Sequence, residues 1–257
     1  TIPFYIFYSM FGFQRIGDLA WAAGDSRSRG FLLGATAGRT TLNGEGLQHE
    51  DGHSHLLSAT IPNCISYDPC FSYELAVIIQ NGLERMIKNQ EDVFYYITIM
   101  NENYSHPEMP KNVNEDIIKG IYKYSENKAK GPKVQLMGSG VILREVIEAA
   151  SILEKDFNIG STIFSVTSFT EVRRNALDVQ RWNMLNPEKT EKKSVLDEII
   201  VDLESPIITA TDYMKSFAEQ IATFLPNKFI SLGTDGFGRS DSREALRDFF
   251  EVDRNHI

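Results

Sequence analysis

Residues 63–99 read NCISYDPCFSYELAVIIQNGLERMIKNQEDVFYYITI, and this stretch decides the fold class. Residues 63–66 and 93–99 are short, apolar and rich in β-branched and aromatic side chains, which favours buried strands. Between them, residues 71–88 carry apolar side chains at helical spacing, and Pro69 is tolerated in the first turn of a helix. A strand, a helix and a second strand in this order predict a parallel sheet covered by helices.

The same alternation continues on both sides of this unit. Upstream, helical spacing over residues 14–27 precedes a short strand at 31–38. Downstream, polar residues 101–132 contain three prolines and are predicted to form a linker or long connection. Beyond it, strands are predicted at 134–137, 161–166, 206–210 and 229–232, and helices at 141–156, 171–182, 194–204, 212–224 and 243–250. We therefore predict an α/β protein of two consecutive units with mostly parallel sheets, at 1–105 and 133–257, joined by a linker at 106–132.

Composition bounds the class of protein. The chain has 257 residues, of which 42% are hydrophobic, so it can bury real cores. A formal charge of -9 argues against a nucleic-acid surface and against binding to an anionic membrane. No run approaches eighteen apolar residues, so no membrane-spanning helix is predicted. The two cysteines, Cys64 (expected to be buried) and Cys70, are too few for a disulfide scaffold, so the reducing cytosol is expected. The start at Thr1 and the end after a helix-like segment suggest a fragment of a longer protein.

Residues 42–55, LNGEGLQHEDGHSH, are the main candidate for a functional loop. They contain three histidines and three acids, and their glycines disfavour a helix: His49, His53, His55, Glu45, Glu50 and Asp51. A zinc site would need His49 and His53 on one helix face, which Gly52 argues against. Three surface histidines are a second interpretation. Proton transfer or anion binding at a cofactor is the interpretation that we favour.

Two other stretches have open interpretations. The aromatic run at residues 4–13 favours core packing, with a stacking platform for a flat heterocycle as the alternative, and Arg15 is either an anion anchor or a surface charge. The loop at 233–242, GTDGFGRSDS, has the spacing GxxGxG. It is either a phosphate cradle or, as we favour, the start of the next helix, capped by Ser240 or Asp241. Thr211 or Asp212 is the expected cap of the helix at 212–224.

Several segments of the sequence together resemble one family. They are FYSMFGFQRIGD, TLNGEGLQHEDGHSH, IPNCISYDP, YYITIMNENY, WNML and TDGFGRSDSRE. In this order they resemble the homodimeric-type pyruvate dehydrogenases, which are transketolase-like enzymes dependent on thiamine diphosphate. The resemblance implies part of a pyrimidine-binding middle domain at 1–105 and a transketolase C-terminal-like domain at 133–257. On this resemblance, we expect the domain that holds diphosphate and Mg²⁺, and the glutamate that activates the aminopyrimidine, to lie outside this sequence.

The resemblance also assigns roles to five residues. Tyr8 and Phe11 match the aromatic positions that pack on the aminopyrimidine ring, and Arg15 orients that wall. His49 matches a catalytic histidine that faces the thiazolium side and the substrate carbonyl, and Glu45 matches a nearby acid of the active-site channel. His53 and His55 belong to the same segment as His49, but the resemblance gives them no definite role.

The implied reaction is decarboxylation of pyruvate and reductive acetylation of a lipoyl group on the acetyltransferase component of a multienzyme complex. The implied enzyme is a cytoplasmic homodimer that uses thiamine diphosphate and Mg²⁺, with no nucleic-acid or membrane partner. We expect the isolated chain to be inactive and to bind no cofactor. The alternatives are a relative acting on another 2-oxo acid, or a non-catalytic dimerisation or assembly module.

Overall fold

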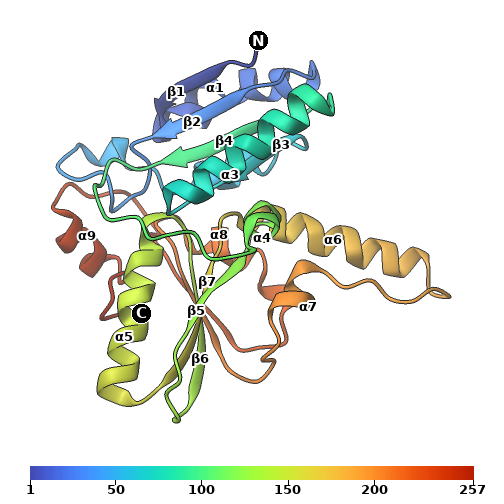
Figure 1. Cartoon of the computed structure of the whole chain (residues 1–257). Coiled ribbons are helices and arrows are strands. Elements are labelled where there is room, and N and C mark those ends of the chain that lie inside the picture. The colour runs from blue at the N-terminus through green and yellow to red at the C-terminus, as the bar shows by residue number, and fades with distance from the viewer.

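The computed structural model describes residues 1–257 as two α/β domains, one above the other in Figure 1. The first sheet has four strands in the spatial order β1-β2-β4-β3, and the second has five in the order β5-β7-β6-β8-β9. Every strand pairing is parallel except that of β5 with β7. The prediction of two consecutive α/β units with mostly parallel sheets is confirmed.

The first domain is built around the strand–helix–strand unit predicted from residues 63–99. Its elements are β1 (Phe4–Tyr8), α1 (Ser9–Asp25), β2 (Phe31–Ala35), α2 (Ser54–Ser58), β3 (Cys64–Tyr67), α3 (Ser72–Leu83) and β4 (Phe94–Ile99). Helix α3 begins at Ser72, one residue after the predicted start, and a helical segment at Glu84–Lys88 continues it to the predicted end. The Glu74 carboxylate accepts hydrogen bonds from the backbone N–H groups of Cys70 and Phe71 at 2.6 and 2.9 Å and so caps the first turn.

In the second domain, the helices predicted at 194–204 and 212–224 are shorter in the structure, and the helix predicted at 171–182 is longer. Its elements are α4 (Asn114–Lys119), β5 (Tyr122–Glu126), β6 (Lys133–Gly138), α5 (Leu143–Phe157), β7 (Gly160–Ser165), α6 (Phe169–Leu185), α7 (Val195–Ile199), β8 (Ile207–Ala210), α8 (Lys215–Glu219), β9 (Phe229–Leu232) and α9 (Arg243–Phe249). The segment predicted as a linker at 106–132 contains α4 and β5. Ile117 and Tyr122 from this segment lie buried in the apolar core of the first domain, so the segment is structured.

Two predicted helix caps were wrong. Met214 rather than Thr211 or Asp212 precedes α8, because the buried Asp212 carboxylate instead accepts hydrogen bonds from Thr40 N–H at 2.7 Å and the Thr41 hydroxyl at 2.6 Å in the first domain. Helix α9 is capped by Ser242 rather than by Ser240 or Asp241, and the Ser242 hydroxyl accepts from Ala245 N–H at 3.2 Å.

The aromatic run at residues 4–13 is mostly not core. Only Phe13 is fully buried, whereas Phe4, Tyr5 and Tyr8 are 47%, 57% and 46% exposed. Strand β1 lies at the edge of the sheet and pairs only with β2. The edge position alone does not expose a strand, since all four residues of β3 at the other edge are buried, so it is the side chains of β1 in particular that are left uncovered. The prediction of core packing therefore fails for β1. Helix α1 begins at Ser9, five residues before the predicted start.

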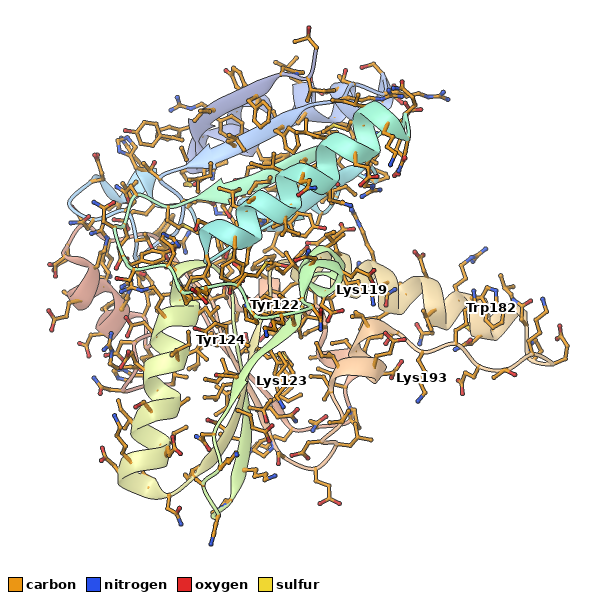
Figure 2. The ribbon with its side chains drawn as sticks, viewed as in Figure 1. Lys119, Tyr122, Lys123, Tyr124, Trp182 and Lys193 are labelled. Carbon is orange, nitrogen blue, oxygen red and sulfur yellow. The ribbon has the colours of Figure 1, made fainter.

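Helix α6 extends away from the body of the molecule, as Figures 1 and 2 show. Trp182 lies near its distal end, and the return segment brings Lys192 Nζ to 4.2 Å from the centre of the indole ring. This cation–π contact anchors the return segment on the helix. None of the helices is long and apolar enough to cross a membrane.

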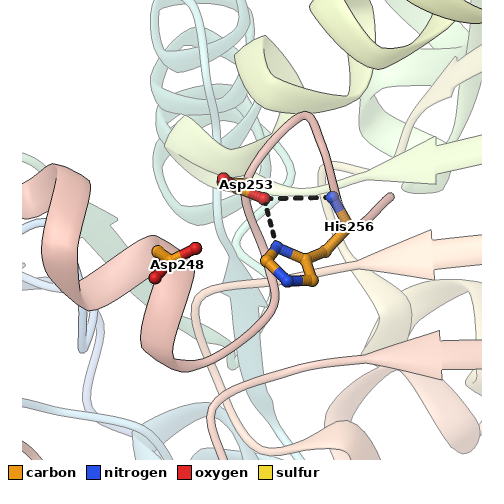
Figure 3. A group of neighbouring side chains, drawn as sticks. All are labelled: Asp248, Asp253 and His256. Carbon is orange, nitrogen blue, oxygen red and sulfur yellow. Dashed lines mark hydrogen bonds and ion pairs between the residues drawn. The ribbon is translucent and has the colours of Figure 1, made fainter.

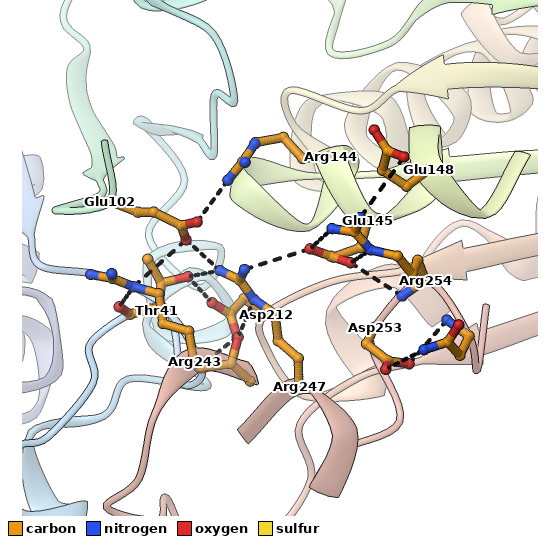
Figure 4. A network of polar contacts seen from close by, with 12 residues as sticks. Thr41, Glu102, Arg144, Glu145, Glu148, Asp212, Arg243, Arg247, Asp253 and Arg254 are labelled. Carbon is orange, nitrogen blue, oxygen red and sulfur yellow. Dashed lines mark hydrogen bonds and ion pairs between the residues drawn. The ribbon is translucent and has the colours of Figure 1, made fainter. Parts of the chain in front are cut away.

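Charged side chains join the two domains in a network that is buried at its centre (Figure 4). Arg247 of α9 lies at its centre, with Nη2 at 2.5 Å from Glu102 Oε2 and Nη1 at 3.6 Å from Glu145 Oε1. Arg144 also bonds Glu102 at 2.7 Å, and Arg254 bonds Glu145 at 2.8 Å. The network therefore connects the segment after β4 to α5 and α9.

Substituting Ser168 with alanine is expected to destabilise the protein by about 1–2 kcal/mol. The Ser168 hydroxyl accepts from Glu171 N–H at 3.0 Å, which caps α6, and donates to the Ser66 carbonyl of β3 at 2.6 Å. The bond to Ser66 is buried and the bond from Glu171 is partly buried, and both would be lost together. Urea unfolding measures the change, with Ser125→Ala on the exposed part of β5 as the control. A loss equal to that of the control would contradict the expectation.

Candidate functional site

The His-rich loop at 42–55 is irregular up to a single 3₁₀ turn at Leu47–His49, and α2 follows from Ser54. Its course is set by Asp51, whose buried carboxylate accepts hydrogen bonds from the backbone N–H groups of His53 and Ser54, each at 3.0 Å. The prediction of a loop is thus confirmed for most of the stretch, and its last residues start a short helix.

All five residues assigned by resemblance come together in one cluster. His49 Nδ1 lies 3.0 Å from Glu45 Oε2, and the imidazole ring is 5.8 Å from the Tyr8 ring and 5.0 Å from the Phe11 ring, edge to face. The Arg15 guanidinium lies over the Phe11 ring, 4.0 Å from its centre. The end of β1, the first turns of α1 and the His-rich loop therefore build one site, defined here as the aromatic–imidazole cluster.

The aromatic–imidazole cluster is open to solvent. Tyr8 is 46% exposed, Arg15 is exposed, and Phe11 and His49 are half-buried. A pair of solvent-accessible aromatic rings beside a hydrogen-bonded imidazole offers a flat apolar surface next to a polar donor. This arrangement suits a flat heterocycle that has a reacting group at its edge.

The other two histidines of the loop take different places. His53 receives a hydrogen bond from the Gln14 amide of α1. His55 is fully buried, with Nε2 at 3.0 Å from Thr98 Oγ1 and its ring stacked on Phe217 at 4.8 Å. Burial lowers the pKa of His55 to about 4, so this imidazole is neutral at physiological pH and belongs to the core. The interpretation as three surface histidines is wrong for His55.

The three histidines do not gather around a common point that could hold zinc. The structure places one group of three potential ligands elsewhere, at Asp248, Asp253 and His256 near the end of α9 (Figure 3). There the His256 ring lies 2.7 Å from Asp253 Oδ1, and the His256 N–H donates to the same oxygen at 3.0 Å. Asp253 is therefore already engaged by His256.

Sequence reasoning missed Asp68, which lies at the junction of the domains. Its buried carboxylate accepts from the hydroxyls of Thr98 at 2.6 Å and Ser139 at 2.9 Å. Burial raises the pKa of Asp68 to about 7, although both hydroxyls oppose the change. An aspartate before Pro69 reads as an ordinary turn residue in the sequence, so no local signal marks its burial.

The glycine-rich loop at 233–242 holds the His-rich loop in place. The Arg39 guanidinium donates to the carbonyls of Thr234 and Gly236, the second at 2.6 Å. Gly44 N–H of the His-rich loop likewise donates to the Asp241 carbonyl at 3.1 Å. The second domain therefore contributes to the position of the loop that carries His49.

Two α/β domains with mostly parallel sheets, and an aromatic–imidazole cluster beside the first sheet, define a protein of the transketolase-like class. The model of the transketolase-like C-terminal domain matches residues 120–253, and that of the pyruvate dehydrogenase E1 component middle domain matches residues 1–107. The chain belongs to the transketolase-like family, whose C-terminal domain model covers more than half of it, and it is similar along its whole length to pyruvate dehydrogenase E1 components.

Relatives and solved structures agree with this assignment. The pyruvate dehydrogenase E1 components of Pseudomonas aeruginosa and Escherichia coli K12 are 63% and 60% identical over the whole chain, which spans 29% of the length of each. A transketolase from Campylobacter jejuni superposes with a TM-score of 0.75 at 16% identity, over 99% of this chain and 34% of that one. A split-gene transketolase, described as an inactive β4 tetramer, gives a TM-score of 0.62 at 14% identity, over 100% of this chain and 74% of that one. These two structures show the shared fold.

Proposed function

We propose that this chain forms the aminopyrimidine side of a thiamine-diphosphate site in a pyruvate dehydrogenase E1 component. The enzyme would decarboxylate pyruvate and reductively acetylate a lipoyl group of its partner acetyltransferase, as a homodimer in the cytoplasm. Family membership supports the class of enzyme. The observation that carries the assignment of the site is the convergence of Tyr8, Phe11 and His49.

The residues present fit part of the cofactor. The open rings of Tyr8 and Phe11 form a wall that suits the flat aminopyrimidine, and Arg15 covers the Phe11 ring and fixes that wall from outside. When bound, thiamine diphosphate supplies the electron sink that decarboxylation of a 2-oxo acid requires. In this proposal Mg²⁺ and the diphosphate are held by a domain outside this chain.

His49 and Glu45 supply the polar chemistry at the edge of this wall. The Glu45 carboxylate 3.0 Å from His49 Nδ1 orients the ring and favours a proton on that nitrogen. Nε2 is then the atom that can donate to, or take a proton from, a substrate oxygen. We therefore assign His49 as the residue that stabilises negative charge on the former carbonyl oxygen, and Glu45 as the residue that positions it.

Replacing Phe11 with alanine in the full-length enzyme is expected to raise the half-saturating concentration of thiamine diphosphate about 3- to 10-fold. The expected cause is loss of one aromatic face of the wall, while turnover at saturating cofactor stays within about 3-fold because His49 remains. Tyr5→Ala is the matched control, since Tyr5 is an exposed aromatic residue of β1 that alternates to the face opposite Tyr8. An unchanged cofactor requirement in the Phe11 variant would refute the assignment of the wall.

A further inference from the structure

The carboxyl group of Glu50 lies in the junction between the His-rich loop and the glycine-rich loop. Glu50 follows His49 directly, yet its side chain points inward and is fully buried. Its Oε2 accepts a hydrogen bond from Arg239 N–H at 2.7 Å, and a Cβ atom on Gly238 would approach that oxygen to 2.7 Å. The two loops are therefore in close contact at this carboxyl group.

This carboxyl group is only half satisfied. Oε1 of Glu50 is buried and has no hydrogen-bond partner. The nearest charged groups do not pair with it: Arg39 directs Nη1 to carbonyls of the glycine-rich loop, and its buried Nε also has no partner. A buried carboxylate with a free oxygen is unfavourable when ionised, whereas a neutral carboxyl group is tolerated.

We propose that Glu50 is a positioning residue for His49, and that the proton on its carboxyl group sets how tightly the second domain holds the His-rich loop. With the proton bound, the two loops pack around a neutral group. When the proton leaves, the bare carboxylate gains from contact with water, which requires the loops to separate. The inference rests on the role proposed for His49, but it concerns loop contact and is tested without turnover.

The direction of the effect follows from the groups around Glu50. Burial raises the pKa of Glu50 to about 7, and the negative charge of Asp212, just after β8, also raises it. The hydrogen bond from Arg239 N–H and the positive charge of Arg39 lower it. Asp51 and Asp235 face Arg39 and raise its pKa, partly offsetting the effect of burial on that guanidinium. In separated loops the carboxyl group returns toward its ordinary value of 4.5. The junction therefore weakens as pH rises from 4.5 to 7 and changes little above that.

Amide hydrogen exchange on the 257-residue chain tests the proposal. The protection factors of the Arg239 and His49 amides, corrected for intrinsic rates, are measured by NMR between about pH 5 and pH 8. Both are expected to fall about 10- to 100-fold over this range. In Glu50→Gln, which cannot ionise, both should stay high, so that the variant is more protected than the wild type at the upper end. Glu244→Gln removes an exposed charge of α9, the helix that follows the glycine-rich loop, and should follow the wild type.

Each other result overturns the proposal. A wild-type profile that does not depend on pH means that the Glu50 proton has no influence on the junction. Lower protection in Glu50→Gln than in the wild type at high pH means that the carboxylate, not the acid, holds the loops together. A response of Arg239 without one of His49, whose N–H donates to the Gly46 carbonyl at 2.8 Å, means that Glu50 does not position His49. If the variant does not fold, the wild-type profile alone decides.

Discussion

Replacing Arg247 with methionine is expected to lower the free energy of unfolding by about 3–5 kcal/mol. Methionine keeps an unbranched apolar stem of similar length, so the change removes mainly the guanidinium. Arg247 is 6% exposed, and it contacts Glu102 and Glu145 and offsets the charge of the fully buried Asp212. Removing the cation leaves these carboxylates in a poorly hydrated place with too little positive charge.

The pH dependence of this loss distinguishes the electrostatic cause from a packing defect. Burial raises the pKa of Glu102, but the hydrogen bonds and charges of Arg247 and Arg144 outweigh it, so the net pKa is lowered. A carboxyl group with a lowered pKa stabilises the fold above its ordinary value of 4.5, and that contribution is lost as pH falls further. The difference between wild type and Arg247→Met should therefore be largest near neutral pH and shrink below pH 4.5.

Urea unfolding at several pH values measures both effects. Arg27→Met is the matched control, because Arg27 pairs with Asp92 only at 3.8 Å on the surface with its side chain 77% exposed. The control should lose less than about 1 kcal/mol. A loss for Arg247→Met that is as small as this, or one that does not change with pH, would contradict the central place of Arg247 between the domains.

The same distinction between local and long-range interactions explains what could be predicted from the sequence. The strand–helix–strand unit at 63–99 was predicted because its apolar spacing is a local property, and β3, α3 and β4 are found there. The cap expected at Asp212 failed because the partners of its carboxylate, Thr40 and Thr41, lie 172 and 171 residues away in the chain. No spacing rule reports a contact of that kind.

The site was predictable to a similar extent. Glu45 and His49 are four residues apart in the His-rich loop, so their contact is local. Their approach to Tyr8 and Phe11 was expected only from the family resemblance. The burial of His55 and the inward direction of Glu50 depend on the second domain, which supplies Phe217 and Arg239. Histidines and acids in one polar loop therefore looked alike in the sequence and differ in the structure.

Replacing His49 with alanine in the full-length enzyme is expected to lower turnover about 100- to 1,000-fold. The half-saturating concentration of thiamine diphosphate should change less than about 3-fold, because the aromatic wall of Tyr8 and Phe11 stays intact. The reason is that His49 faces the reacting edge of the aromatic–imidazole cluster, where it would stabilise charge that develops after the cofactor binds. Steady-state kinetics at varied cofactor concentration separates the two effects.

Two variants of the same loop sharpen this test. Glu45→Gln keeps a group that can hydrogen-bond to His49 Nδ1 but removes the charge, so turnover should fall by less than in His49→Ala. His53→Ala removes an imidazole that contacts Gln14 outside the cluster, and it should stay within about 5-fold of the wild type. Unchanged turnover in His49→Ala, together with a large loss of cofactor affinity, would make His49 part of the binding wall rather than a catalytic residue. Tyr8 and Phe11 would then need a different polar partner at their reacting edge.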